Sequence, residues 1–271
     1  NFGIANYRLG QRRSEAVCLW LQHANLYADG ASRHFTAQRL CDPCRRYCQK
    51  KGQRLSRYYV FGEWLSQPRF SAELAEELCL RASERIDSIA DYPLALIYEL
   101  FDAVSRKWAQ LDYPRRKKMQ DLLPETTGFS DAMIKKGLDE IANLFDSKAL
   151  QQKVTTEFRG IPRGSCFKYC ADTQRLLRWH PLGSVLHVLS GNVFLVGPGS
   201  FLEGVLTGNV TILKESSAET SFMPEFIESL IEAEKELGHE PIVSRSLAVI
   251  EYSAAQKDVI DTMKRHVDGL V

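Results

Sequence analysis

The sequence predicts an α/β protein whose amino-terminal half is helical and whose carboxyl-terminal half is a doubly wound parallel sheet, apparently incomplete at its end. The apolar spacing changes near residue 180 from helical steps to short runs, and these runs alternate with helix-sized segments. Strands that are apolar throughout are typical of parallel sheets covered by helices on both faces. The expected divisions are a helical extension at 1–80, a helical lead-in region at 81–178, and a Rossmann-like half domain at 179–271.

The first half carries helical periodicity. Apolar residues recur there at three- and four-residue steps, the spacing of one buried helix face. Pro93, Pro114 and the segment 124–130 punctuate these helices, and Ser130 is placed to cap the helix that begins at Asp131. The helices expected in this half are 61–66, 71–82, 97–111 and 134–145.

The second half alternates strands with helices. Pro198 suits a first helical turn, Gly208 suits a carboxyl-terminal cap, and Ser253 with Gln256 forms a capping-box pattern. The short runs are β-branched or leucine-rich, as buried strands are. The expected strands are 184–189, 209–213, 246–251 and 267–271, and the expected helices are 198–207, 222–237 and 254–266.

Composition narrows the function classes. The chain has 271 residues, 44% of them hydrophobic and 25% charged, with a net charge of +1. This charge gives no general electrostatic argument for binding nucleic acid or anionic lipid, and no apolar run approaches the roughly 20 residues of a membrane helix. Seven cysteines in a chain without a secretion-signal pattern at its start predict a reducing, cytoplasmic setting.

Polar residues follow two neighbouring strands of the predicted sheet. They are Ser190, Gly191 and Asn192 after the first strand, and Lys214, Ser216 and Ser217 after the second. Ligands of open α/β sheets bind beyond the carboxyl ends of the strands. An Asn amide there can donate to a developing oxyanion, and a Lys can hold ribose hydroxyls or a phosphate.

A structural interpretation of the same residues stays open. Asn192 can simply cap the following helix, and Lys214 can be a solvated strand end. Spacing alone favours this second interpretation.

The amino-acid sequences of these stretches resemble those of a known family. The segments "HPLGSVLHVLSGNVF" at 180–194 and "GVLTGNVTILKESS" at 204–217 resemble the aldehyde dehydrogenase superfamily. They are more similar to the LuxC family of fatty acyl-CoA reductases from bacterial luminescence, as is the upstream helical stretch 122–145. The resemblance covers roughly 85–271 and does not extend to 1–80.

The resemblance implies roles for individual residues. It implies that Asn192 stabilises the oxyanion of a thiohemiacetal, and that Lys214 contacts the adenosine ribose of NADPH or NADH, with Ser216 and Ser217 near the ribose or its 2′-phosphate. Ser190 and Gly191 belong to the same cofactor-binding stretch. The implied reaction reduces an acyl-CoA, or another acyl thioester, to a fatty aldehyde.

The resemblance also implies a nucleophilic Cys that this chain lacks. No cysteine of this chain matches the nucleophile, which belongs to a later catalytic domain of the family. We therefore expect the front portion of such an enzyme. The alternative is a non-catalytic nucleotide-binding or assembly module that uses the amino-terminal helices and cysteines to bind partners. The sequence does not specify the oligomeric state and is compatible with a homo-oligomer.

A cysteine cluster near the amino terminus is a candidate metal site. Cys41, Cys44 and Cys48 are spaced so that their thiolates can reach one zinc ion or iron–sulfur cluster, with His34 or Cys18 as a fourth ligand. On a helix the three would share one face, which equally suits burial of small apolar thiols. Burial is favoured because no second spaced pair is clear.

The remaining candidates favour structural roles. His187 lies within an apolar run and is expected to be a hydrogen-bonded core residue, whereas His180 precedes the strand and could approach a ligand. Cys166 and Cys170 are expected to pack rather than react. The basic segments 45–57 and 114–118 are expected to be solvated faces.

Overall fold

A computed structural model describes residues 55–271 except 162, 164–166, 191–192 and 217–221. The central sheet of this part has the strand order β2-β1-β7-β6-β5-β8. Its strands are β1 (Ser56–Val60), β2 (Glu63–Gln67), β5 (Ser184–Val188), β6 (Val210–Glu215), β7 (Leu247–Glu251) and β8 (Gly269–Leu270).

The last four strands form the parallel core of the sheet. Strand β6 lies between β5 and β7, and β8 flanks β5, with all three pairings parallel. The crossover helices are α9 (Val196–Thr207), α10 (Phe222–Leu237) and α11 (Lys257–His266), and η1 (Ser244–Ser246) leads into β7. The predicted alternation of strands and helices beyond residue 180 is confirmed.

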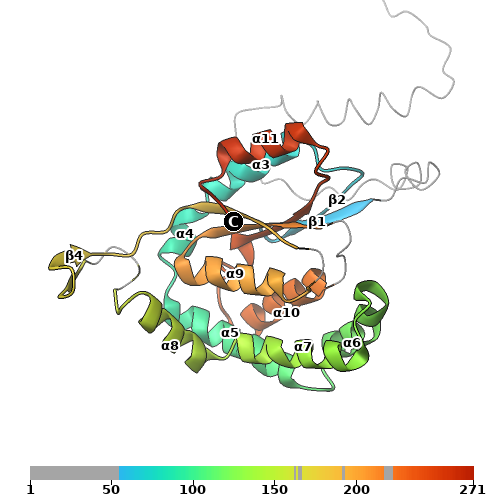
Figure 1. Cartoon of the computed structure of the whole chain (residues 1–271), viewed down its shortest axis with the longest axis horizontal. Helices are drawn as coiled ribbons and strands as arrows, with labels where there is room; N and C mark the ends of the chain where they lie inside the picture. Colours follow the sequence, from blue (N-terminus) through green and yellow to red (C-terminus); the bar gives the residue numbers. More distant parts are fainter. Residues whose placement is uncertain (1–54, 162, 164–166, 191–192, 217–221) are drawn as a thin grey trace, which may run out of the picture. The chain divides into compact units, whose positions relative to one another are not determined.

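Helices cover both faces of the sheet (Figure 1). Helices α11 and α3 (Ala72–Ser83) lie side by side on one face, and α9 and α10 lie on the other. A further helical layer packs against α9 and α10. It contains α5 (Leu94–Ala109), α6 (Pro114–Thr127), α7 (Asp131–Leu144) and α8 (Ser147–Glu157), and α4 (Ile86–Ala90) connects it to α3.

Local signals explain several helix ends. The hydroxyl of Ser130 accepts a hydrogen bond from the Met133 amide, so the predicted cap of α7 is confirmed. Gly208 ends α9 with φ of 78°, the left-handed conformation that favours glycine. Pro93 and Pro114 stand at helix starts as expected. Pro124, in contrast, lies inside α6, which continues to Thr127.

The segment 61–66 is not helical, and the prediction there is wrong. Strands β1 and β2 form an antiparallel hairpin, joined by the two residues Phe61 and Gly62. Strand β1 also pairs antiparallel with β7, so the hairpin extends the main sheet. Positive φ values at both turn residues, 51° and 99°, match the tight hairpin turn that suits strand twist.

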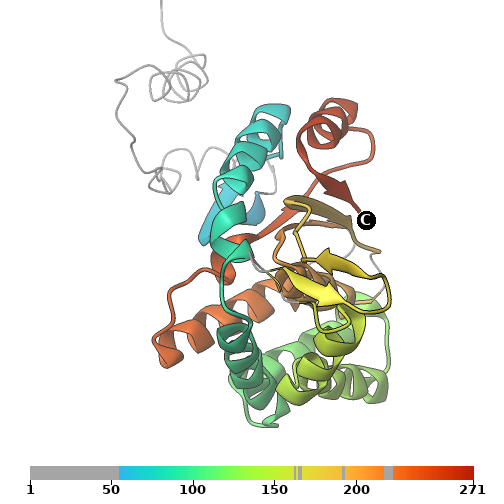
Figure 2. The same cartoon turned by 90° about the vertical axis from the view of Figure 1, so that its left-hand side faces the viewer.

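A second, smaller hairpin lies apart from the main sheet. Strands β3 (Lys168–Cys170) and β4 (Arg175–Leu177) pair antiparallel and project from the helical layers (Figure 1), and they face the viewer in Figure 2. In the described part of the chain, no helix is long and apolar enough to cross a membrane.

Candidate cofactor site at the strand ends

The carboxyl ends of β5 and β6 lie next to each other. Val188 and Lys214 are register partners in the parallel pair, and the Leu189 amide donates to the Lys214 carbonyl over 3.0 Å. Ser190 follows directly and is exposed. The structure therefore brings Ser190, Lys214 and Ser216 to one edge of the sheet, as the sequence predicted.

Three other predicted site residues, Gly191, Asn192 and Ser217, fall outside the described residues. The predicted oxyanion donor, Asn192, therefore has no structural description. The candidate metal ligands Cys41, Cys44, Cys48 and His34 are also outside. Within the described ranges, no group of three or more His, Cys, Asp and Glu side chains is arranged to hold a metal ion.

Lys214 makes a contact that the sequence analysis missed. Its Nζ lies 5.5 Å from the centroid of the Tyr252 ring, which is the distance range of a cation–π interaction. Tyr252 is the first residue after β7, the strand beside β6. The rule that ligands bind beyond strand ends, applied to the predicted strand 246–251, would have pointed to this residue.

The two described cysteines differ in their surroundings. Cys79 is buried in α3, its Sγ is 3.8 Å from the Met263 sulfur, and burial raises the pKa of its thiol to about 11. Cys170 is in the projecting hairpin and is partly buried, and Cys166 lies outside the described residues, so the expectation that these cysteines pack rather than react stays a prediction. A hydrogen bond from Thr173 lowers the pKa of the Cys170 thiol.

The histidines of this region have structural positions. His187 is buried in β5, as predicted, and burial lowers the pKa of its imidazole. Its Nε2 does not make the expected hydrogen bond, since this atom has no partner in the described structure. His180 is exposed and precedes β5, at the opposite end of the strand from Ser190.

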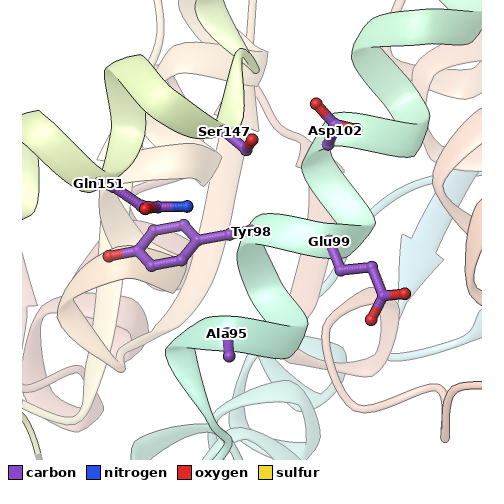
Figure 3. Close-up of a pocket in the computed structure, with 6 residues that line it drawn as sticks. All are labelled: Ala95, Tyr98, Glu99, Asp102, Ser147 and Gln151. Atoms are coloured by element: carbon purple, nitrogen blue, oxygen red, sulfur yellow. The ribbon is translucent and has the colours of Figure 1, made fainter.

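A pocket between two helices of the helical layer has both of its carboxylates in ion pairs. It lies between α5 and α8 and is shown in Figure 3, where the Tyr98 ring and the Gln151 amide point toward each other. Its two carboxylates are already paired, Glu99 with His239 at 3.2 Å and Asp102 with Arg106 at 2.9 Å. The lining residues are Ala95, Tyr98, Glu99, Asp102, Ser147 and Gln151.

Comparison with solved structures defines the class of fold. A glyceraldehyde-3-phosphate dehydrogenase from Methanocaldococcus jannaschii, solved with NADP, matches 76% of this chain and 43% of its own, with a TM-score of 0.56 and 15% identity. A betaine aldehyde dehydrogenase from Staphylococcus aureus, solved with NAD+, matches 83% of this chain and 51% of its own, with a TM-score of 0.55 and 15% identity. The described part of the chain therefore has an aldehyde dehydrogenase-like fold.

Sequence comparison narrows the class to a family. Residues 89–271, more than half of the chain, match the family model of acyl-CoA reductase (LuxC). The chain belongs to this family, and the resemblance inferred from the sequence is confirmed.

The curated relatives that match this chain include two that carry the description long-chain acyl-protein thioester reductase. The one from Vibrio harveyi is 27% identical over 68% of this chain and 38% of its own length. The one from Photobacterium phosphoreum is 32% identical over 55% of this chain and 30% of its own length. The chain thus spans about a third of each relative.

Proposed function

We propose that this chain forms the nicotinamide-nucleotide-binding part of an acyl thioester reductase. The observation that carries the proposal is the position of Lys214 at the carboxyl edge of a parallel sheet, beside Ser190, in a member of the acyl-CoA reductase family. The Lys214 side chain is partly buried and makes no ion pair in the described part of the chain. An ammonium group in this position can hold a ribose hydroxyl or a phosphate.

The proposed reaction converts an acyl thioester, a reduced nucleotide and a proton into an aldehyde, a thiol and the oxidised nucleotide. The acyl group transfers to a cysteine thiolate, the substrate thiolate leaves and takes up the proton, and NADPH or NADH bound at this site would supply the hydride. Asn192 donates a hydrogen bond to the resulting oxyanion, and release of the aldehyde regenerates the thiolate. Burial raises the pKa of the Cys79 thiol to about 11, which disfavours the thiolate, and the resemblance to the family implies a nucleophile among other residues of the enzyme.

Nucleotide titration of the purified chain tests this assignment. We expect NADPH or NADH to bind, and Lys214→Ala to weaken binding about tenfold, the effect of losing one contact to a charged group. Lys135→Ala is a matched control because this exposed lysine lies on α7 in the helical layer. Unchanged affinity of Lys214→Ala would remove Lys214 from the site.

A further inference from the structure

The Lys214 side chain shares a face of the sheet with Tyr252. The Thr211 side chain lies against Gly204 of α9, so closely that a Cβ added at Gly204 would overlap the Thr211 hydroxyl. Side chains alternate along a strand, so Lys214 lies on the opposite face, which α3 and α11 cover. Glu215, the residue after Lys214, and its register partner Glu251 face α9 and α10 instead.

An aromatic ring is therefore the partner that sets the direction of the Lys214 ammonium group. The ring attracts the cation through its negative face, at 5.5 Å from Nζ to centroid. A lysine side chain has four rotatable bonds, and ordering them costs free energy when a ligand binds. A contact that orders the side chain beforehand removes part of this cost.

The Tyr252 ring is itself held in place from behind. It stacks on Phe70, with centroids 6.1 Å apart and ring planes 19° apart, and only 8% of Tyr252 is exposed. Phe70 makes an edge contact with Tyr58 of β1 at 5.3 Å. The Gln256 amide, at the start of α11, donates to the Phe70 carbonyl over 2.7 Å. These contacts connect the β1–β2 hairpin to the end of β7.

We infer that Tyr252 is a positioning residue for Lys214, and that Phe70 and the β1–β2 hairpin hold Tyr252 in its working position. The inference rests on the proposed function of Lys214. It extends the nucleotide site to Phe70 and β1, which precede the residues 89–271 that match the family.

A double-mutant cycle on the full chain tests the inference. In a calorimetric titration with NADPH and NADH, Tyr252→Leu is expected to weaken binding about threefold, the range of a partly exposed cation–π contact. Tyr252→Phe keeps the ring and is expected to bind like the wild type. In a Lys214→Ala background, Tyr252→Leu is expected to have no further effect. Equal losses in the two backgrounds would show that Tyr252 acts independently of Lys214 and would overturn the inference.

Two further variants separate positioning from stability. Phe70→Leu keeps the Tyr252 side chain but removes the ring that stacks behind it, so Tyr252 is held less firmly and an approximately twofold weakening of nucleotide binding is expected. Tyr113→Leu removes a comparable contact in the helical layer, where Lys107 Nζ lies 5.8 Å from the Tyr113 ring. Its nucleotide affinity should equal that of the wild type. A loss as large as that of Tyr252→Leu would mean that the effect is general destabilisation.

A measurement without nucleotide distinguishes this inference from the proposed function. After reductive ¹³C-methylation, which keeps the charge of lysine, the Lys214 signal can be assigned with Lys214→Arg. The Tyr252 ring should shift this signal upfield in the wild type and in Tyr252→Phe, and Tyr252→Leu should abolish the shift. Absence of the shift in the wild type overturns the positioning contact. Failure of the wild type to bind either nucleotide overturns the proposed function instead.

Discussion

Glu234 is a carboxylate buried between α10 and the turn that precedes β7. Only 2% of the residue is exposed, and one carboxylate oxygen accepts a hydrogen bond from the Ser244 amide at 2.9 Å. The other oxygen has no partner in the described structure. Desolvation raises the pKa of this carboxyl above its usual range, although the Ser244 hydrogen bonds oppose the shift. A buried acid of this kind costs stability when it is ionised.

This residue predicts a pH dependence of stability with a definite sign. Because the folded pKa is raised, the native state binds the proton more tightly than the unfolded state does, and stability falls as the pH rises above the ordinary glutamate pKa. Glu234→Gln does not titrate. We therefore expect the free energy of unfolding of the wild type, relative to Glu234→Gln, to increase as the pH is lowered from 7 toward 5.

Urea unfolding followed by circular dichroism at several pH values measures this difference. Glu236→Gln is a suitable control, because Glu236 lies on the same helix with its side chain 61% exposed. The difference between the wild type and this control should change little with pH. A wild-type stability that runs parallel to that of Glu234→Gln at every pH would contradict the assignment.

At the scale of elements, the parallel strands were predictable and the hairpin was not. Runs of apolar residues identify β5, β6 and β7 because both faces of each strand are covered, and this pattern is local in the sequence. The turn between β1 and β2 lacks the usual Asn-Gly or Asp-Gly signal, since Phe61 occupies its first position. Phe61 is buried and lies beneath the Arg85 guanidinium, 4.8 Å from its ring centroid. Packing between distant residues therefore favours a backbone conformation that local preference disfavours.

The same distinction applies to the site. The strand-end rule placed Ser190, Lys214 and Ser216 at one edge because it depends only on strand order and direction. The contact of Lys214 with Tyr252 depends on the pairing of β6 with β7 and on Phe70, which is 182 positions earlier in the chain than Tyr252. No periodicity in a single sequence reports a contact of that range.

Two helix-ending glycines provide a matched pair for an element-scale prediction. Gly208 after α9 and Gly128 after α6 both have left-handed backbones, with φ of 78° and 71°. Replacing either glycine with alanine should lower the free energy of unfolding by about 1 kcal/mol, because alanine disfavours the left-handed backbone conformation. At Gly208 the new Cβ would also lie 3.3 Å from the Ala90 Cα and 3.4 Å from the Arg163 side chain, whereas nothing lies within 4 Å at Gly128.

Gly208→Ala should therefore destabilise the protein by about 1 kcal/mol more than Gly128→Ala. Chemical unfolding of the two variants under one set of conditions provides the comparison. Equal losses would mean that α4 moves away from the end of α9 without cost.

Across the whole molecule, Arg163 joins elements that are far apart in the sequence. Its guanidinium donates to the carbonyls of Val205 and Leu206 at the end of α9, at 2.7 and 3.2 Å. The other nitrogen donates to the carbonyls of Ile89, at 2.8 Å, and Tyr92, which lie at the end of α4. The guanidinium thus satisfies carbonyls at the ends of two helices, one against the sheet and one leading into the helical layer.

Replacing this guanidinium should weaken the whole fold rather than one helix. Burial lowers the pKa of Arg163 to about 10, so the group stays charged at neutral pH and its hydrogen bonds are charge-assisted. Arg163→Met leaves the carbonyls without this partner, and we expect a loss of about 2–4 kcal/mol in the free energy of unfolding. Arg163→Lys should recover only part of the loss, because one ammonium group cannot span both helix ends in a planar fork.

Arg175→Met is the control for the loss of an arginine, because Arg175 is exposed on the projecting β4. This substitution should change the free energy of unfolding by less than about 0.5 kcal/mol. Urea unfolding followed both by far-ultraviolet circular dichroism and by tryptophan fluorescence should give one coincident transition for Arg163→Met, shifted to lower urea. Separate transitions would show that Arg163 holds together two parts that unfold independently. A midpoint equal to that of the wild type would show that the carbonyls find other partners, and that the guanidinium does not connect the two layers energetically.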